Sequence, residues 1–251
     1  MLILVLIAAA CWGSFLNVVA CRLIEGTSLL VRSHCPLCAH TIAWHDLFPV
    51  LSWFKLKGRC RYCSTKISLL YPAIELITLI SFGLAYPLIS PLYLLSYFLF
   101  FSALIITIRT DLEHMLIIRL CSLYLIPIGL LLSFLDLLPI CFYNSLAGAC
   151  VGFGILWGIR KAYWLARHQE GMGDGDQELL AAIGAFTGIL GVWLTLLLAS
   201  LSASLYGIAL LIFFGESKNF KLPFGPFLAL GAITYVLFSQ HLIALLGLAA
   251  L

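Results

Sequence analysis

Long apolar runs constrain the fold of this chain more than any other feature of its sequence. A helix needs about 20 mostly apolar residues to cross a bilayer. No run alternates apolar and polar residues as a barrel strand does. The 63% hydrophobic and 10% charged residues exclude an ordinary soluble domain. The sequence therefore predicts an all-α polytopic membrane protein with about eight transmembrane helices, at 1–21, 69–88, 91–110, 115–135, 141–160, 178–197, 198–215 and 223–250.

The basic residues predict how these helices are oriented. Arg and Lys gather in the segment 22–68, between the fifth and sixth runs, and between the seventh and eighth at Lys218 and Lys221. Basic loops stay in the cytoplasm. We therefore expect both termini outside, with Asp111 and Asp176 on the cytoplasmic side. This distribution accounts for the net charge of +3, so no nucleic-acid partner is expected.

The runs and loops suggest three parts: a first transmembrane helix (1–21), a polar loop (22–68) and a seven-helix membrane domain (69–251). Ala8-Ala9-Ala10-Cys11 hints at a lipoprotein cleavage site. No positive charge precedes it, however, and the apolar stretch continues to Cys21. A retained first span is therefore expected, and not a cleaved signal peptide.

Two aspartates are the leading candidates for chemistry. Asp111 and Asp176 each lie where an apolar run meets a polar segment. Placing a carboxylate at such a position is costly, so acids there are functional candidates. Two carboxyls held close together do not both ionise easily, and such a couple can act as an acid and a base on water. The pair predicts an aspartic protease at a membrane surface.

The second aspartate ends the glycine-rich stretch Gly171-Met172-Gly173-Asp174-Gly175-Asp176. Glycine permits backbone conformations that are closed to other residues, which suits a loop that a substrate strand approaches. The structural alternative is that Asp176 only caps the next helix. A further alternative is an ion-coupled transporter, in which the acids mark an ion path and the glycines break a helix.

Four cysteines in the polar loop form two Cys-x-x-Cys pairs, Cys35 with Cys38 and Cys60 with Cys63. This spacing favours a structural zinc ion held by four thiolates, with no coordination position left open for catalysis. Disulfides or a redox role are the alternative, although a reducing cytosol disfavours disulfides. We expect the other five cysteines to be buried apolar residues and the loop histidines not to be ligands. The aromatic residues between the pairs are expected to cover the loop: Trp44, Phe48, Trp53 and Phe54.

An ordered set of motifs over nearly the whole chain resembles the type IV prepilin peptidase family. The set comprises Gly13-Ser14-Phe15-Leu16-Asn17 with Arg22, the four-cysteine loop with Trp44, Asp46, Pro49 and Ser52, Tyr71-Pro72-Ala73-Ile74-Glu75, the glycine-aspartate stretch, and Pro223-Phe224-Gly225-Pro226. Both Asp174 and Asp176 fit the family's Gly-x-Gly-Asp pattern. The following Leu179-Leu180-Ala181-Ala182 sets the register and favours Asp176.

The resemblance implies the catalytic pair Asp111 and Asp176, with Gly171, Gly173 and Gly175 in the active-site loop. It also implies cleavage of prepilin or pseudopilin leaders after a glycine, at the cytoplasmic face of the bacterial inner membrane. Methylation of the new N-terminus from S-adenosylmethionine is expected as a second activity of this family.

Three positions depart from the family pattern. Ile118-Arg119 stands where a Pro-Asp pair is usual, Glu178 stands where a Lys is usual, and Cys21 replaces a Tyr. An acid at position 178 disfavours ionisation of neighbouring acids and removes a cation. These changes keep open the alternative of an assembly factor with an impaired protease site.

Overall fold

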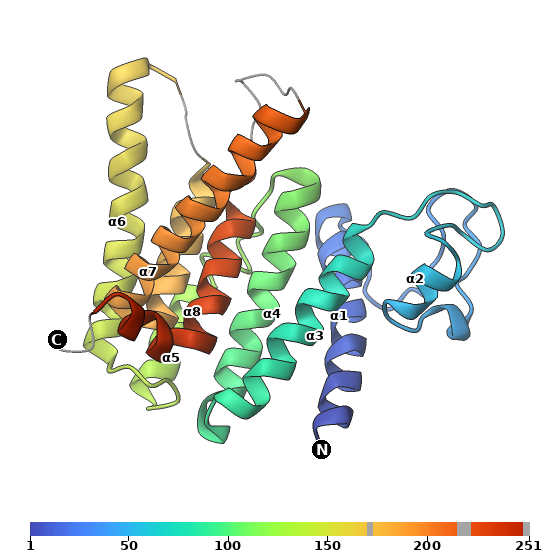
Figure 1. The fold of residues 1–251 in the computed structure, drawn as a ribbon, viewed down its shortest axis with the longest axis horizontal. Helices are drawn as coiled ribbons and strands as arrows, with labels where there is room; N and C mark the ends of the chain where they lie inside the picture. The colour runs from blue at the N-terminus through green and yellow to red at the C-terminus, as the bar shows by residue number, and fades with distance from the viewer. Residues whose placement is uncertain (170–172, 215–221, 248–251) are drawn as a thin grey trace. The chain divides into compact units, whose positions relative to one another are not determined.

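The computed structural model describes residues 1–169, 173–214 and 222–247. Gly171, predicted to belong to the active-site loop, lies outside the described residues, as do Lys218 and Lys221. The described chain is helical, with two isolated bridges and no strand (Figure 1). The helices are α1 (Leu2–Glu25), η1 (Trp44–Asp46), α2 (Leu51–Lys55), α3 (Leu70–Leu88), α4 (Pro91–His114), α5 (Leu125–Phe134), α6 (Phe142–Arg167), α7 (Asp174–Phe214) and α8 (Gly225–Leu245).

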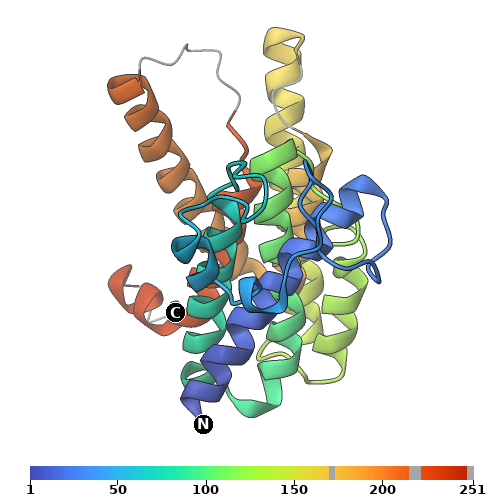
Figure 2. The ribbon, with the colours of Figure 1, turned by 90° about the vertical axis from the view of Figure 1, so that its right-hand side faces the viewer.

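The chain divides into two compact units, Met1–Ser90 and Pro91–Leu251. The helix α3, which we expected to group with the later helices, packs with α1 in the first unit. The two helices approach closely where Gly13 meets Thr78, because a side chain at Gly13 would lie 2.9 Å from the Thr78 Cβ. The polar loop joins α1 to α3 and lies at the end of this helix pair away from Met1 (Figures 1 and 2).

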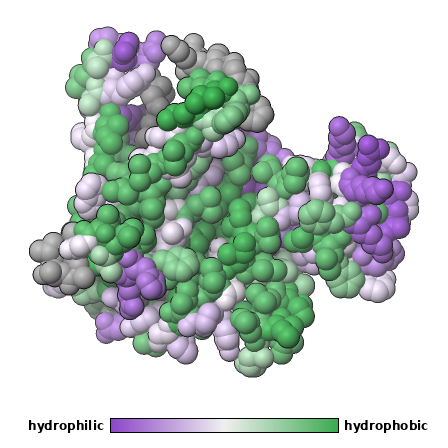
Figure 3. All heavy atoms as spheres, viewed as in Figure 1, coloured by the Kyte–Doolittle hydropathy of each residue, from purple (hydrophilic) through white to green (hydrophobic). Residues whose placement is uncertain are grey.

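Six of the described helices are long and apolar enough to cross a membrane: α1, α3, α4, α6, α7 and α8. Hydrophobic side chains cover much of the helices, whereas hydrophilic ones gather on the polar loop (Figure 3). Each of the eight expected spans falls on one of these helices or on α5, and two of them fall on α7. The predicted span 115–135 contains only the ten-residue helix α5. A helix of that length rises about 15 Å, half of the hydrocarbon thickness.

The predicted spans 178–197 and 198–215 lie within one element, α7, which is broken at Gly188. Gly188 has φ 72° and ψ −175°, a conformation that favours glycine. A Cβ at Gly184 would lie 2.8 Å from Val192 Cγ2, eight residues on. Eight residues of straight helix rise about 12 Å, so the chain bends back sharply at Gly188. The predicted boundary between residues 197 and 198 is thus ten residues too late.

The first arm of α7 is the centre of the second unit, because residues 179–188 are all buried. Glycines bring α6 against it: a Cβ at Gly148 would lie 2.4 Å from the Gly184 carbonyl oxygen. Small residues at such contacts let helix backbones pack closely in membranes. On another side, Phe186 stacks on Phe100 of α4, with ring centroids 4.4 Å apart. This packing fixes the start of α7 relative to the ends of α4 and α8.

Candidate active site and metal centre

Asp111 lies at the buried end of α4, where residues 100–111 are all enclosed. Asp111 is only 5% exposed, so it is not a charged residue that water solvates at the end of a helix. The backbone N–H of Gly225 donates to Asp111 Oδ2 at 3.0 Å. Gly225 begins α8, where the first backbone N–H groups lack partners within the helix. One oxygen of the carboxyl group is therefore fixed by the start of α8.

Contacts of Ile117 show that Asp176 lies close to Asp111. A Cβ at Gly175 would lie 2.8 Å from Ile117 Cβ, and one at Gly225 would lie 3.2 Å from Ile117 Cδ1. The side chain of Ile117 thus lies between the first turn of α7 and the first turn of α8. Asp176 follows Gly175 directly, and the charge of Asp111 acts on its carboxyl group. The structure places the two predicted aspartates together across this isoleucine.

Asp174 lies apart from this pair. Its side chain is 72% exposed and forms an ion pair with Arg160 of α6. Gly173, just before the helix, lies beside Asp176, because a Cβ on it would be 4.0 Å from Asp176 Oδ2. The two aspartates that fit the glycine pattern therefore occupy different surroundings, and Asp176 is the one whose carboxyl group interacts with the charge of Asp111.

The departures at Arg119 and Glu178 contact each other. Arg119 Nε lies 4.0 Å from Glu178 Oε1, and the buried Ser122 donates its hydroxyl to Glu178 Oε2 at 3.0 Å. These contacts join the segment between α4 and α5 to the first turn of α7, close to Ile117. The acid at position 178 thus has a cation and a hydroxyl donor of its own. The sequence alone indicated neither the pairing nor the part of Ser122.

We expect Glu178→Ala to lower the free energy of unfolding by about 1.5–3 kcal/mol, because a hydrogen bond to a charged acceptor contributes about that much. Arg119→Ala should cost less than about 1 kcal/mol, because its side chain is largely exposed. Denaturant unfolding of the purified variants measures both. Equal losses for the two variants would contradict the inference that the hydrogen bond from Ser122 stabilises the protein more than the ion pair with Arg119. The charge-swapped double variant R119E/E178R is the control for simple loss of charge.

The four cysteines of the polar loop meet in one cluster. Their sulfur atoms all lie within 4.8 Å of one another, and Cys35 Sγ is 3.7 Å from Cys63 Sγ. The two Cys-x-x-Cys pairs adopt the same turn. In each turn the first cysteine carbonyl accepts the N–H of the residue after the second cysteine, Ala39 or Ser64. Both of these residues have positive φ angles, 55° and 58°.

This donor set fits zinc. Sulfurs bound at about 2.3 Å to a tetrahedral ion lie about 3.8 Å apart. Backbone N–H groups of Cys38 and Leu37 lower the pKa of the Cys35 thiol to about 6. The Thr65 N–H acts in the same direction on Cys63, but desolvation and the neighbouring sulfurs outweigh it and raise its pKa to about 12. Four thiolates this close need a cation between them, which a divalent ion supplies.

Charged side chains form hydrogen bonds within the polar loop and between the loop and helices α1 and α3. Arg61, inside the second cysteine turn, donates to Asp46 at 2.6 and 2.5 Å and holds the pKa of that carboxyl below its usual range. Arg22 of α1 donates to the carbonyls of Ser28, Leu29 and Val31. Glu75 of α3 accepts the Val50 N–H at 2.7 Å. The sequence placed Glu75 in a family motif but did not indicate this contact.

The expectation that aromatic residues cover the loop is mostly wrong. Trp44, Phe48 and Phe54 are exposed, and only Trp53 is partly enclosed, with its indole N–H donating to the Ile67 carbonyl at 3.2 Å. The folded loop is too small to enclose all four large side chains. Among the other cysteines, Cys121 is buried as expected, whereas Cys11, Cys141 and Cys150 are exposed.

Two family models match the chain. The Bacterial Peptidase A24 N-terminal domain matches residues 7–89, and the Type IV leader peptidase family matches residues 98–208. These ranges lie on either side of the division between Ser90 and Pro91. The first range holds the four-cysteine loop, and the second holds both aspartates. No solved structure matches the chain.

Curated relatives match most of its length. A "Prepilin leader peptidase/N-methyltransferase" from Aeromonas salmonicida (strain A449) is 38% identical over 209 residues, which are 82% of this chain and 71% of the relative. A relative of the same name from Bacillus subtilis (strain 168) is 33% identical over 92% of both chains. A "Type 4 prepilin-like proteins leader peptide-processing enzyme" from Escherichia coli O78:H11 is 34% identical over 82% of this chain and 76% of the relative.

Proposed function

The chain belongs to the type IV leader peptidase family, and from this premise we propose that it is a membrane aspartic endopeptidase that removes the leader of type IV prepilins or type II secretion pseudopilins. Cleavage follows a glycine at the cytoplasmic face of the inner membrane, where the basic loops predict the active site. The observation that carries the proposal is the meeting of Asp111 and Asp176 across Ile117.

In the proposed reaction one aspartate is ionised and takes a proton from a water molecule. The resulting hydroxide attacks the scissile carbonyl, while the other, protonated aspartate donates its proton to the carbonyl oxygen. Collapse of the tetrahedral intermediate breaks the C–N bond, and a proton from the pair goes to the leaving amine. The two carboxyls share macroscopic pKa values, so neither role is assigned to one residue.

The surroundings of the pair suit these roles. The Gly225 N–H holds Asp111 Oδ2, so this carboxyl has one fixed orientation. A Cβ at Gly225 would lie 2.7 Å from this oxygen, so a larger residue there would push the Asp111 carboxyl out of its position. The departures at Arg119 and Glu178 pair with each other, so the acid at position 178 has a cation beside it. This pairing favours an active protease over an impaired assembly factor.

We also propose that the chain methylates the new N-terminus, as the names of its relatives state for them. The methyl donor, S-adenosylmethionine, would supply an electrophilic methyl group. A cavity lined by Trp157, Arg160, Lys161 and Trp164 of α6 does not fit this donor, because Arg160 and Lys161 would repel the positive sulfonium. We assign no residue to this cofactor.

Mass spectrometry of a co-expressed prepilin tests both activities at once. The intact mass of the pilin reports whether the leader is removed and whether a methyl group is added. We expect a product that is cleaved after the glycine and methylated. A precursor that stays uncleaved, with this protein present in the membrane at normal levels, would overturn the proposal.

The same measurement separates the two activities by region. Cys60→Ser leaves three zinc ligands and weakens the folding of the loop. We expect this variant to impair methylation more than cleavage, because both aspartates lie in the other unit. A cleaved but unmethylated pilin supports this division. An uncleaved precursor would instead show that the loop also serves the protease.

A further inference from the structure

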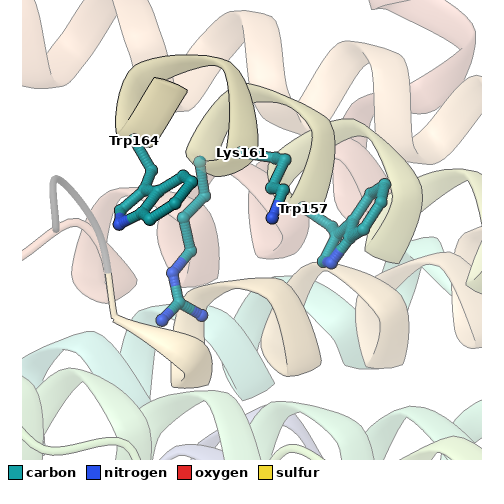
Figure 4. Close-up of a pocket in the computed structure, with 4 residues that line it drawn as sticks. Trp157, Lys161 and Trp164 are labelled. Carbon is teal, nitrogen blue, oxygen red and sulfur yellow. The ribbon is translucent and has the colours of Figure 1, made fainter. Parts of the chain in front are cut away.

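A cavity of about 270 Å³ lies against the C-terminal half of α6, lined by Trp157, Arg160, Lys161 and Trp164. These residues stand at positions i, i+3, i+4 and i+7, a spacing that places them on one face of a helix. Figure 4 shows the side chains of Trp157, Lys161 and Trp164 projecting from one side of α6. The cavity therefore combines two indole rings with two cations.

The two cations differ in what they contact. Arg160 forms an ion pair with Asp174. The ammonium of Lys161 lies over the ring of Trp164, 4.9 Å from its centroid, and pairs with no carboxylate of the described residues. Among the described residues, the carboxylate that pairs with these two cations is Asp174, and it pairs with Arg160. A positive charge is thus left for an anion, with Lys161 as its main source.

The position of the cavity indicates which anion it meets. The helix α6 is a candidate membrane span that ends at Arg167, so the cavity lies within its last eleven residues. Trp157 is 53% exposed and Trp164 is 43% exposed. Exposed tryptophans near the end of a span are typical of the membrane interface, where basic residues attract anionic headgroups.

We propose that this cavity binds the phosphate group of an anionic phospholipid. Lys161 contacts the phosphate, and the two indole rings lie against the glycerol and the upper part of the acyl chains. A soluble phosphate would make no use of the two exposed rings, whereas a lipid covers both. The ion pair of Arg160 with Asp174, two residues before Asp176, places this lipid at the active-site end of α6.

Native mass spectrometry of the detergent-purified full chain, supplied with phosphatidylglycerol or phosphatidylcholine, tests the proposal without any measurement of cleavage. We expect the wild type to retain phosphatidylglycerol in preference to phosphatidylcholine. Lys161→Gln should weaken this retention about fivefold, the factor that one basic residue near an anionic surface contributes. Lys161→Arg keeps the charge and should retain the lipid.

Arg167→Gln is the matched control, because it removes the same charge from the same helix outside the cavity. It should retain phosphatidylglycerol as the wild type does. An equal loss in Lys161→Gln and Arg167→Gln would overturn the proposal, since it would show a general surface charge effect. Equal retention of both lipids would overturn it too. Binding of inorganic phosphate as tightly as the lipid would show a site for a free anion instead.

Discussion

Asp111→Asn and Asp176→Asn are each expected to abolish leader cleavage while the protein still folds and inserts. A carboxamide cannot exchange the proton that the pair shares. General acid–base groups contribute about 10²–10⁴-fold to rates, so the loss should reach at least that range. An asparagine at position 111 still offers a carbonyl oxygen to the Gly225 N–H, which favours a folded variant. Initial rates on a synthetic prepilin, with purified variants, measure the effect.

Asp174→Asn is the control for this experiment. It keeps the size of the side chain and removes only the ion pair that the exposed Asp174 forms with Arg160. Exposed pairs contribute about 0–1 kcal/mol, so most of the activity should remain. An inactive Asp174→Asn variant together with an active Asp176→Asn variant would show that the other Gly-x-Gly-Asp register is the catalytic one.

Freshly purified, reduced protein is expected to hold about one zinc ion per chain through its four loop cysteines. Structural zinc contributes about 10–16 kcal/mol in small domains that depend on it. A strong chelator should therefore remove the metal and unfold the loop. Cys60→Ser, which leaves three ligands, should weaken both metal binding and the folding of the loop. Elemental analysis measures the metal, and limited proteolysis of the segment 22–68 measures the folding of the loop.

Cys141→Ser is the matched control, because Cys141 is exposed and lies outside the cluster. It should leave both the zinc content and the protection of the loop unchanged. Fresh, reduced protein without any metal would overturn the zinc assignment. Metal that remains after Cys60→Ser, with the loop still protected, would show that three ligands suffice and that the fourth cysteine is dispensable.

Sequence patterns located the helices well but not all of their ends. Helix formation follows from local apolar composition, so the runs at α1, α3, α4 and α6 could be recognised directly. The break at Gly188 was missed because the apolar residues continue through it without a polar interruption. The burial of Glu75 and its bond to Val50 were missed for a related reason, since these residues are 25 positions apart in the chain.

The sequence by itself determined the membrane class, the four-cysteine donor set and the identity of the two candidate aspartates. These properties depend on residue types and short spacings, which are read directly from neighbouring positions. Only the tertiary structure decided that Asp111 meets Asp176 across Ile117, that Arg119 and Glu178 offset each other, and that α3 packs with α1. Such contacts join segments tens of residues apart, and they depend on how helices pack in three dimensions.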